Sequence, residues 1–286
     1  MIIVVRLLGL LSVVLFQSSS YAQPVYQVQG QLKGDYKKMT AQGMAIWGDK
    51  AYLLNNPGWC RIYDFGRGMV ICSFPLASLD ENNHANNASF GFEKVGGSNM
   101  PGLYVSEYRK PYRCFVEKVE EGKSSLIQTI TSDCRGDNAV NQDWVVDRKS
   151  RKLYSISKLE VIKEGNKTTR RHHIVRYRLP SLSEGANVVL LEKDMEDAFD
   201  VYFPNIFQGA TIRGRYMYVS AGLQDGHEQR WDAKRALIVI DLKQKRIKHI
   251  MDLTDITEGR EPEGLDFNGR QLLLFCGQKG GIYRIK

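Results

Sequence analysis

Hydrophobic and polar positions along the chain form a phrase that occurs five times. Each copy has a polar residue, a short apolar strand, a tight turn and a second apolar strand. The clearest copies begin at Gln42, Gln208 and Glu263, each followed by glycine, and weaker copies begin at Asn86 and Gln142. Their spacing of about 45 to 65 residues indicates a repeat architecture. Each copy is typical of the inner half of a β-propeller blade, so the sequence predicts an all-β, five-bladed β-propeller.

The segments after each copy complete the predicted blades. Four blades have four strands, whereas the fifth, which starts at Glu263, has three. In the third blade the predicted outer strand is Val188–Leu191. The alternating segment 25–32 has no local partner; we expect it to pair outside Gly281–Ile285, which would close the ring and leave no open edge. A six-bladed ring is the alternative, if the stretch 157–205 contains a further blade.

The first residues have the composition of a secretory leader. Arg6 precedes the apolar run Leu7–Phe16, and the segment Ser20–Ala22 supplies small residues for a cleavage site. A membrane anchor is the alternative, but the apolar run is short for spanning a bilayer. We therefore expect a signal peptide over residues 1–22 and one β-propeller domain over 23–286. No later stretch of the sequence predicts a membrane span, so the mature protein is expected to be secreted or periplasmic.

The chain carries a formal net charge of +8 at pH 7. Its basic residues are scattered, and no stripe of basic and aromatic residues indicates nucleic acid. We expect a basic, exported monomer without a nucleic-acid partner.

The five cysteines could form disulfides, which an exported chain permits. Cys60 and Cys72 flank one predicted hairpin, and counting outward from its turn places them opposite each other. Cys114 and Cys134 flank another hairpin less symmetrically. Unpaired thiols are the alternative at both places. No cysteine or histidine spacing suggests zinc.

In a propeller, the first residue of each inner strand lies at the mouth of the central channel. Five polar positions should therefore converge on one axis, and Asp143, next to one of them, is a further candidate. The five are Gln42, Asn86, Gln142, Gln208 and Glu263. Amides both donate and accept hydrogen bonds, which suits a small molecule, a peptide, a glycan or a cation's carbonyl ligands. The alternative is that these groups bond to one another and to channel water.

The rim of the same face adds candidates. The predicted connections Leu159–His172 and Gly222–Arg235 are long, and the second carries Trp231. Long loops on a channel face commonly carry binding residues. His84 precedes an inner strand and could act as a base, a ligand contact or a turn residue. Tyr108 and Trp231 could stack on a ring of the ligand.

The phrase Thr40-Ala-Gln-Gly-Met-Ala-Ile resembles the first blade of the plant-type and bacterial glutamine cyclotransferases. The last blade, from Glu263-Gly-Leu-Asp-Phe to Ile282-Tyr-Arg-Ile, is similar to theirs. The resemblance implies an exported five-bladed propeller that converts an N-terminal glutamine to pyroglutamate without a metal, with Gln42 as its inner-channel glutamine. The family's catalytic glutamate lies in a Gly-Glu-Gly-Leu phrase of blade two. This chain has Asn86 and no carboxylate there, and an amide cannot move the proton that cyclisation requires.

Three functions are consistent with these residues. The first is an exported propeller that binds a small molecule, peptide or glycan at the channel mouth, with or without catalysis. The second is a glutaminyl-peptide cyclotransferase-like enzyme in which Glu263 or Glu261 replaces the missing acid. The third is a calcium-dependent hydrolase with Gln42, Gln208 and Glu263 around a central calcium ion, because Glu261-Pro-Glu-Gly resembles a phrase of the five-bladed apyrases. One or two carboxylates make a weak calcium site, and no other cofactor is indicated.

Overall fold

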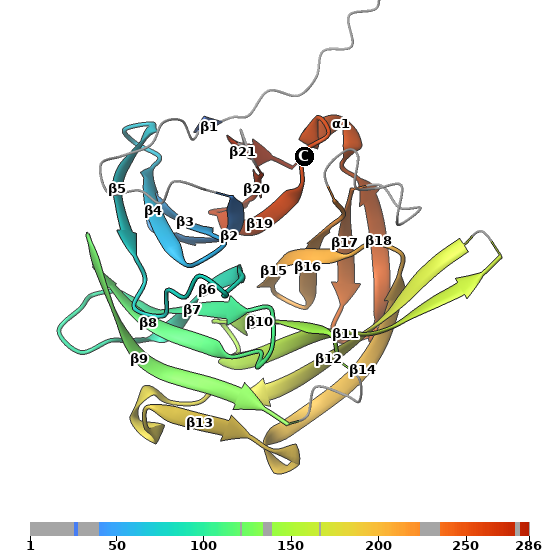
Figure 1. Cartoon of the computed structure of the whole chain (residues 1–286), viewed down its shortest axis with the longest axis horizontal. Helices are drawn as coiled ribbons and strands as arrows, with labels where there is room; N and C mark the ends of the chain where they lie inside the picture. The colour runs from blue at the N-terminus through green and yellow to red at the C-terminus, as the bar shows by residue number, and fades with distance from the viewer. Residues whose placement is uncertain are drawn as a thin grey trace, which may run out of the picture.

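Five sheets stand in a ring around one axis, and nearly all the regular structure is β (Figure 1). The computed structural model describes residues 26–27, 40–120, 122–133, 139–165, 167–223, 235–277 and 281–285. Each sheet is built on an antiparallel meander whose first strand lies nearest the axis (Figure 1). The predicted five-bladed β-propeller is confirmed, and the predicted leader, residues 1–22, lies outside the described residues.

The strands follow the blades in chain order. Blade one contains β2 (Ala41–Trp47), β3 (Lys50–Asn55), β4 (Trp59–Asp64) and β5 (Met69–Pro75). Blade two contains β6 (Ala85–Lys94), β7 (Pro101–Glu107), β8 (Cys114–Glu120), β9 (Lys123–Ser132) and β13 (Asn187–Leu190). Blade three contains β10 (Asn141–Asp147), β11 (Lys152–Glu164), β12 (Lys167–Arg178) and β14 (Met195–Phe203). Blade four contains β15 (Phe207–Arg213), β16 (Tyr216–Ala221), β17 (Ala236–Asp241) and β18 (Arg246–Asp252). Blade five contains β19 (Pro262–Asn268), β20 (Gln271–Cys276), β21 (Gly281–Arg284) and β1 (Tyr26–Gln27). Short helical turns are η1 (Leu182–Glu184), η2 (Glu192–Asp194) and α1 (Thr254–Thr257).

The two ends of the chain share the fifth blade, as the sequence predicts. β1 pairs antiparallel with β21, with Tyr26 opposite Ile282 and Gln27 opposite Gly281. The rest of the predicted strand, residues 28–32, lies outside the described residues. Because the first and last strands of the ring are hydrogen-bonded to each other, the edge of β21 is covered.

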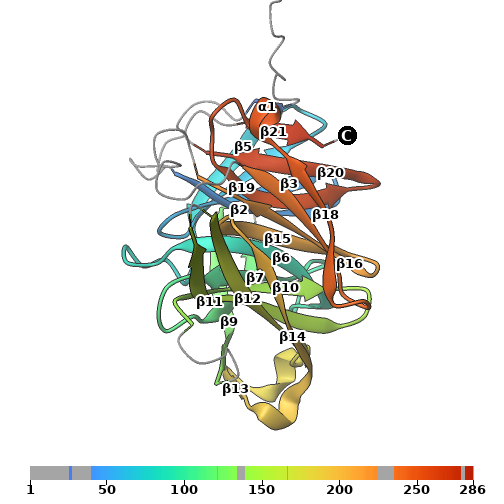
Figure 2. The ribbon, with the colours of Figure 1, turned by 90° about the vertical axis from the view of Figure 1, so that its right-hand side faces the viewer.

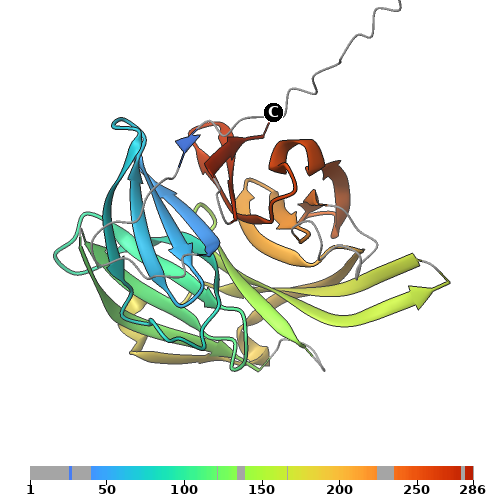
Figure 3. The same ribbon diagram turned by 45° about the horizontal axis from the view of Figure 1, so that its top comes forward.

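The prediction for the stretch 157–205 is wrong in two places. Val188–Leu191 was expected at the edge of blade three, but β13 pairs parallel with β9 and extends blade two. The long β14 takes the outer place in blade three, where it pairs with β12. The expected loop Leu159–His172 is instead the continuation of β11 and β12, a hairpin that extends beyond the ring (Figures 1 and 3). These elements account for the residues that a sixth blade would have needed.

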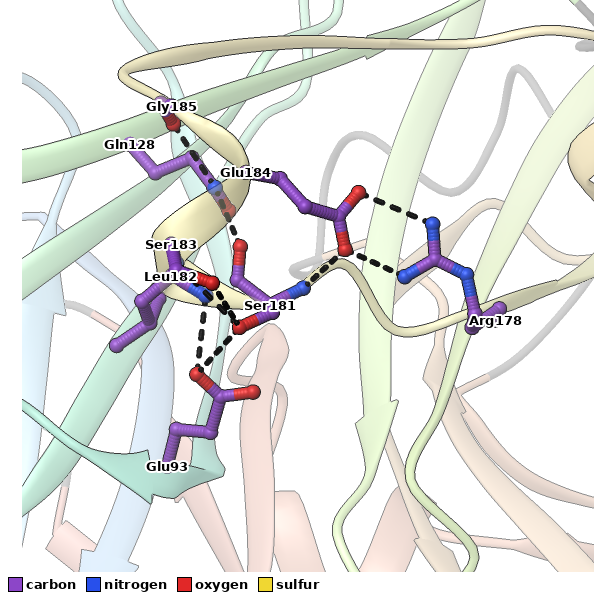
Figure 4. Close-up of polar contacts among 8 residues, drawn as sticks. All are labelled: Glu93, Gln128, Arg178, Ser181, Leu182, Ser183, Glu184 and Gly185. Carbon is purple, nitrogen blue, oxygen red and sulfur yellow. Dashed lines mark hydrogen bonds and ion pairs between the residues drawn. The ribbon is translucent and has the colours of Figure 1, made fainter.

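Hydrogen bonds around η1 attach the segment that follows β12 to blade two (Figure 4). The Glu184 carboxylate accepts from the Arg178 guanidinium at 2.5 and 3.0 Å and from the Ser181 backbone nitrogen at 2.7 Å. The Gln128 amide of β9 donates to two backbone carbonyls of this turn, and Glu93 at the end of β6 accepts from the Ser181 hydroxyl at 3.1 Å. These bonds hold the chain in position to place β13 along β9, at the lower end of the molecule in Figure 2.

Apolar clusters fill the gap between each two neighbouring blades. Residues from both sides of the five gaps include Leu54 and Phe90, Tyr104 and Trp144, Ile174 and Ile238, Leu237 and Leu274, and Leu53 and Leu273. All of these side chains are buried. Burial on both faces explains why the inner and middle strands are apolar along most of their length.

The bridge between Cys60 and Cys72, one of the two alternatives left open by the sequence, does not form. In the β4–β5 ladder, Phe74 lies opposite Cys60 and Ile62 lies opposite Cys72. The register of this ladder shifts between Ile62 and Tyr63, so counting outward from the turn gives the wrong pairs. The Cys60 and Cys114 thiols are free, and burial raises the pKa of both thiols. Cys134 lies outside the described residues.

The glycine of the repeated phrase lets the inner strands touch at the axis. A Cβ on Gly43 would lie 2.9 Å from the backbone nitrogen of Ala88, and one on Gly209 would lie 2.5 Å from the carbonyl oxygen of Glu263. A Cβ on Gly264 would overlap the backbone of blade one. At these separations no side chain fits, so glycine is required where backbone meets backbone.

Blades two and three have no glycine at this position, and their side chains fill the axis instead. In blade two, the Asn87 amide donates to the carbonyl of Trp144 at 2.8 Å. Its oxygen accepts from the backbone nitrogen of Ala210 at 3.1 Å. Asn87 therefore joins blades two, three and four at the centre of the ring, and the channel is closed there by backbone and one amide.

Replacing Gly264 by alanine should destabilise the whole ring. The new methyl group would overlap the inner strand of blade one, and overpacking of this kind typically costs about 1–3 kcal/mol. We expect a lower midpoint in thermal or urea unfolding. Gly96 is the matched control, because a Cβ there meets nothing within 4 Å. Equal stability of Gly264→Ala and Gly96→Ala would contradict the close contact.

Candidate functional site

The polar residue of the repeat stands at a β-bulge in four of the five inner strands. The register of β2 shifts between Ala41 and Met44, and that of β19 between Pro262 and Leu265. Corresponding shifts occur in β6 and β15. A bulge leaves a residue out of the ladder and re-aims its side chain. The bulge therefore interrupts the regular alternation of side chains along the strand and changes the direction of the polar side chain.

β10 has no bulge, and this changes which residue of blade three enters the site. Its ladder is regular, with Gln142 opposite Ser157 and Asp143 opposite Ile156. The Gln142 amide oxygen accepts a hydrogen bond from the Ser157 hydroxyl at 3.2 Å, within its own blade. Successive side chains of a regular strand point to opposite faces, so Asp143 takes the place that Gln142 was expected to occupy.

Hydrogen bonds join the mouth residues of blades two to five. The Asn86 amide donates to Asp143 Oδ2 at 2.7 Å and to the carbonyl oxygen of Gln208. The Gln208 amide donates to the carbonyl of Gly222 at 3.0 Å and to Glu261 Oε1. The structure thus brings Asn86, Asp143, Gln208 and Glu261 into one cluster, although they are far apart in sequence.

Glu263 and Gln42 lie at the edge of this cluster. A Cβ on Gly277 would lie 3.6 Å from Glu263 Oε1 and 3.7 Å from the Cβ of Glu261, so the two glutamates border the same small residue. Gln42 is 5% exposed, and its carbonyl lies against Gly264 of blade five. All five blades therefore contribute to the mouth.

Burial keeps the carboxyl groups of the mouth protonated at higher pH than usual. Asp143 and Glu263 are buried, and burial raises the pKa of both carboxyls well above their ordinary values. Glu261 and Asp143 raise the pKa of Glu263 further, because a nearby negative charge disfavours ionisation. Burial raises the pKa of the half-buried Glu261 to about 7. At neutral pH the mouth therefore combines carboxylic acids with amides, and Glu261 titrates there.

Several buried polar atoms at the mouth have no hydrogen-bond partner within the described residues. Among them are Oε1 of Gln42, Oδ1 of Asn86, Oδ1 of Asp143 and Oε2 of Glu263. An unsatisfied buried polar group costs about 1–3 kcal/mol, and native proteins contain few of them. Their concentration at one place makes the mouth the candidate binding site.

His84 and Tyr108 form the aromatic part of the rim. Their ring centroids are 5.4 Å apart. The Tyr108 hydroxyl accepts a hydrogen bond from the Asn141 amide at 2.5 Å. Burial, with a smaller effect of Arg109, lowers the pKa of His84 to about 4, so this imidazole is neutral at pH 7. Both side chains are half-buried, which suits contact with a ligand at the mouth.

Sequence reasoning missed two amides of this region, Asn87 and Asn141. Asn87 occupies the position that glycine fills in three other copies of the repeat, and that exception is the signal that could have found it. Asn141 directly precedes Gln142, but a hydrogen bond to Tyr108 of another blade cannot be read from local pattern.

Two predicted features of the site, a contact of Trp231 with the ligand and a calcium ion in the channel, stay predictions. Trp231 and most of its loop, residues 224–234, lie outside the described residues. Within the part of the chain that the structure describes, no three or more histidine, cysteine, aspartate or glutamate side chains are grouped as in a metal site. The calcium ion considered for the channel thus stays a prediction.

Comparison with known proteins shows kinship of fold. No known family matches the sequence, and no curated protein matches it. Among solved structures, glutaminyl cyclase of Myxococcus xanthus is similar with a TM-score of 0.51 and 10% identity, over 91% of this chain and 93% of that one. Raptor of Chaetomium thermophilum gives a TM-score of 0.46 and 8% identity, over 90% of this chain and 20% of that one. The resemblance stated from the sequence is confirmed at the level of the fold.

The raised pKa of Glu261 predicts a pH dependence of stability. Its pKa is about 7 in the folded protein against an ordinary 4.5, so the folded state binds more protons between these pH values. The free energy of unfolding should therefore fall as pH rises from about 4.5 to about 7, with a contribution from this residue on the order of 3 kcal/mol. Urea unfolding at a series of pH values measures it.

Glu261→Gln should flatten this pH dependence, because the amide does not titrate. Glu192→Gln, at an exposed position in η2, is the matched control and should keep the slope of the parent. An unchanged slope in Glu261→Gln would show that the carboxyl group has an ordinary pKa.

Proposed function

We propose that the channel mouth binds a ligand with a primary amine, either a small molecule or the free N-terminus of a peptide. The observation that carries the proposal is the set of unpartnered buried oxygens of Gln42, Asn86, Asp143 and Glu263. The amide oxygens accept hydrogen bonds, and the carboxyl oxygens accept them once the carboxyls are ionised, whereas an ammonium has three N–H donors and no acceptor. A glycan fits this set less well, because each hydroxyl also brings acceptor lone pairs that need donors.

The carboxyl groups of the mouth suit the same ligand. An ammonium next to Asp143, Glu261 and Glu263 favours their ionised form. Burial opposes ionisation of these carboxyls in the free protein. When the ammonium binds, its positive charge would allow one of them to lose its proton. Release of protons on binding near neutral pH is the expected signature.

The leader predicted over residues 1–22 supports a secreted or periplasmic location for this binding protein. Its apolar run Leu7–Phe16 follows a basic residue, as in export signals. Among the residues that the structure describes, no helix is long and apolar enough to cross a membrane.

Calorimetric titration with a pair of peptides tests the binding function. A short peptide with a free N-terminus should bind saturably, and its N-acetylated form should bind at least about tenfold more weakly, because it lacks the charge and two donors. Glu263→Gln should weaken binding of the free peptide by a similar factor. Glu192→Gln, the same substitution at an exposed position of η2, serves as the control.

Equal binding of the free and acetylated peptides would refute recognition of an amine. The same conclusion would follow if Glu263→Gln, shown to be folded, bound the free peptide as the parent does. A glycan that binds with both peptides inactive would favour the sugar-binding alternative.

A second candidate function is glutaminyl cyclisation, and Glu261 is the observation that favours it. Its pKa of about 7 suits a group that both takes and gives a proton at neutral pH. Its hydrogen bond with Gln208 orients the carboxyl group. In this reaction the α-amine attacks the side-chain amide carbon, and a new C–N bond closes the ring. Glu261 would take the proton of the amine and give it to the leaving nitrogen, which departs as ammonia.

Detection of ammonia with a glutamine-initiated peptide tests this enzyme function. Activity should be present in the parent and fall by about 10²–10⁴-fold in Glu261→Gln, the usual range for loss of a general acid–base. A peptide that begins with asparagine is the substrate control. If the folded parent binds the glutamine peptide but releases no ammonia, cyclisation is excluded and the binding function stands.

A further inference from the structure

A cavity of about 150 Å³ lies at the end of the axis away from the carboxyl cluster. Its lining includes Ile46, Phe90, Val146, Thr211 and Asp266, one from the inner strand of each blade. These residues follow the mouth residues by three or four positions, or about 10 to 13 Å along the strands. The backbone contacts at the repeat glycines lie between, so the cavity is separate from the mouth.

Three cationic side chains border this cavity. Arg148 and Lys149 belong to the turn after β10, and Arg213 ends β15. The Arg148 guanidinium lies 5.0 Å from the centroid of the Trp47 ring, and that of Arg213 lies 4.6 Å from the centroid of the Phe267 ring. Each arginine is thus held by an aromatic ring of another blade, which fixes its place at the cavity.

The two carboxylates of the lining are already engaged. Asp266 accepts hydrogen bonds from two backbone N–H groups and from the Thr211 hydroxyl, at 2.7 to 3.0 Å. Asp147 accepts from backbone N–H groups of its own turn at 3.1 and 3.3 Å. Within the described residues, the Arg148 and Lys149 side chains form no hydrogen bond or ion pair. Burial raises the pKa of Asp266, and Arg148 acts on that carboxyl only through its charge, which lowers the pKa. The cavity therefore offers cationic donors that its own carboxylates do not occupy.

We propose that this cavity binds a small oxyanion of about the size of phosphate. A cavity of about 150 Å³ has room for a tetrahedral anion of this size. Arginine matches two oxygens of such an anion with parallel N–H groups, and lysine adds a point charge. This site is independent of the function proposed for the mouth, because it shares no side chain with the carboxyl cluster.

Thermal unfolding in the presence of inorganic phosphate, sulfate or acetate tests the proposal, with sodium chloride holding the ionic strength constant. At least one of these anions should raise the unfolding midpoint saturably. The double variant Arg148→Gln/Lys149→Gln should need an at least about tenfold higher concentration, because it loses the charged donors. Lys193→Gln, at an exposed position in η2, is the control and should respond as the parent does.

Lys149→Gln alone guards against misfolding of the double variant, because this exposed side chain makes no contact that the fold requires. It should weaken the anion effect in the same direction. A response of equal size in the parent and in both cavity variants would overturn the site, as would a non-saturating response to all three anions. The relative effect of phosphate, sulfate and acetate then identifies which oxyanion the cavity prefers.

Discussion

Contact between inner strands at the axis is the constraint on which the structure depends. Gly43, Gly209 and Gly264 leave no room for a side chain, so the strands of four blades meet backbone to backbone. Asn87 closes the remaining space with hydrogen bonds to two other blades. Within the described residues, the inner strands and Asn87 thus meet at the axis, between the two ends of the ring.

The contact between inner strands also determines the polarity of the mouth and the pKa values of its carboxyls. The bulges that accompany the contacts direct polar side chains to one end of the axis, where water is limited by the neighbouring blades. Burial then raises the pKa of Asp143, Glu261 and Glu263. A cluster of uncharged acids next to unsatisfied amides is the consequence, and it is the feature from which the proposed amine recognition is derived.

Much of the architecture could be predicted because the repeat is visible in the local pattern of polar, glycine and apolar residues. The polar–glycine pair at Gln42, Gln208 and Glu263 marks the inner strand of its blade, and the unpaired segment before Gln42 predicts the closure of the ring. The site was harder to predict in blade three. Whether Gln142 or Asp143 faces the axis depends on whether β10 has a bulge. An alternating sequence pattern does not reveal which strands have bulges and which, like β10, have none.

The remaining errors concern non-local pairing. Val188–Leu191 reads as a strand, and the structure confirms that it forms one, but its sequence does not specify which sheet edge it joins. The polar contacts of Ser181 and Glu184 with blade two decide that choice. Likewise, the alternation of β11 and β12 beyond Lys158 is weak, so the sequence pattern predicts a loop where the structure has the projecting hairpin.

Carbon-13 NMR of glutamate carboxyl groups as a function of pH tests the central claim most directly, because it observes the acids of the mouth themselves. We predict one glutamate signal that titrates near pH 7 and disappears in Glu261→Gln. A second signal should titrate well above the ordinary range and disappear in Glu263→Gln. If every glutamate in the folded protein titrated near its ordinary pKa of 4.5, the mouth would be ionised and solvated, and a buried acid cluster would be contradicted.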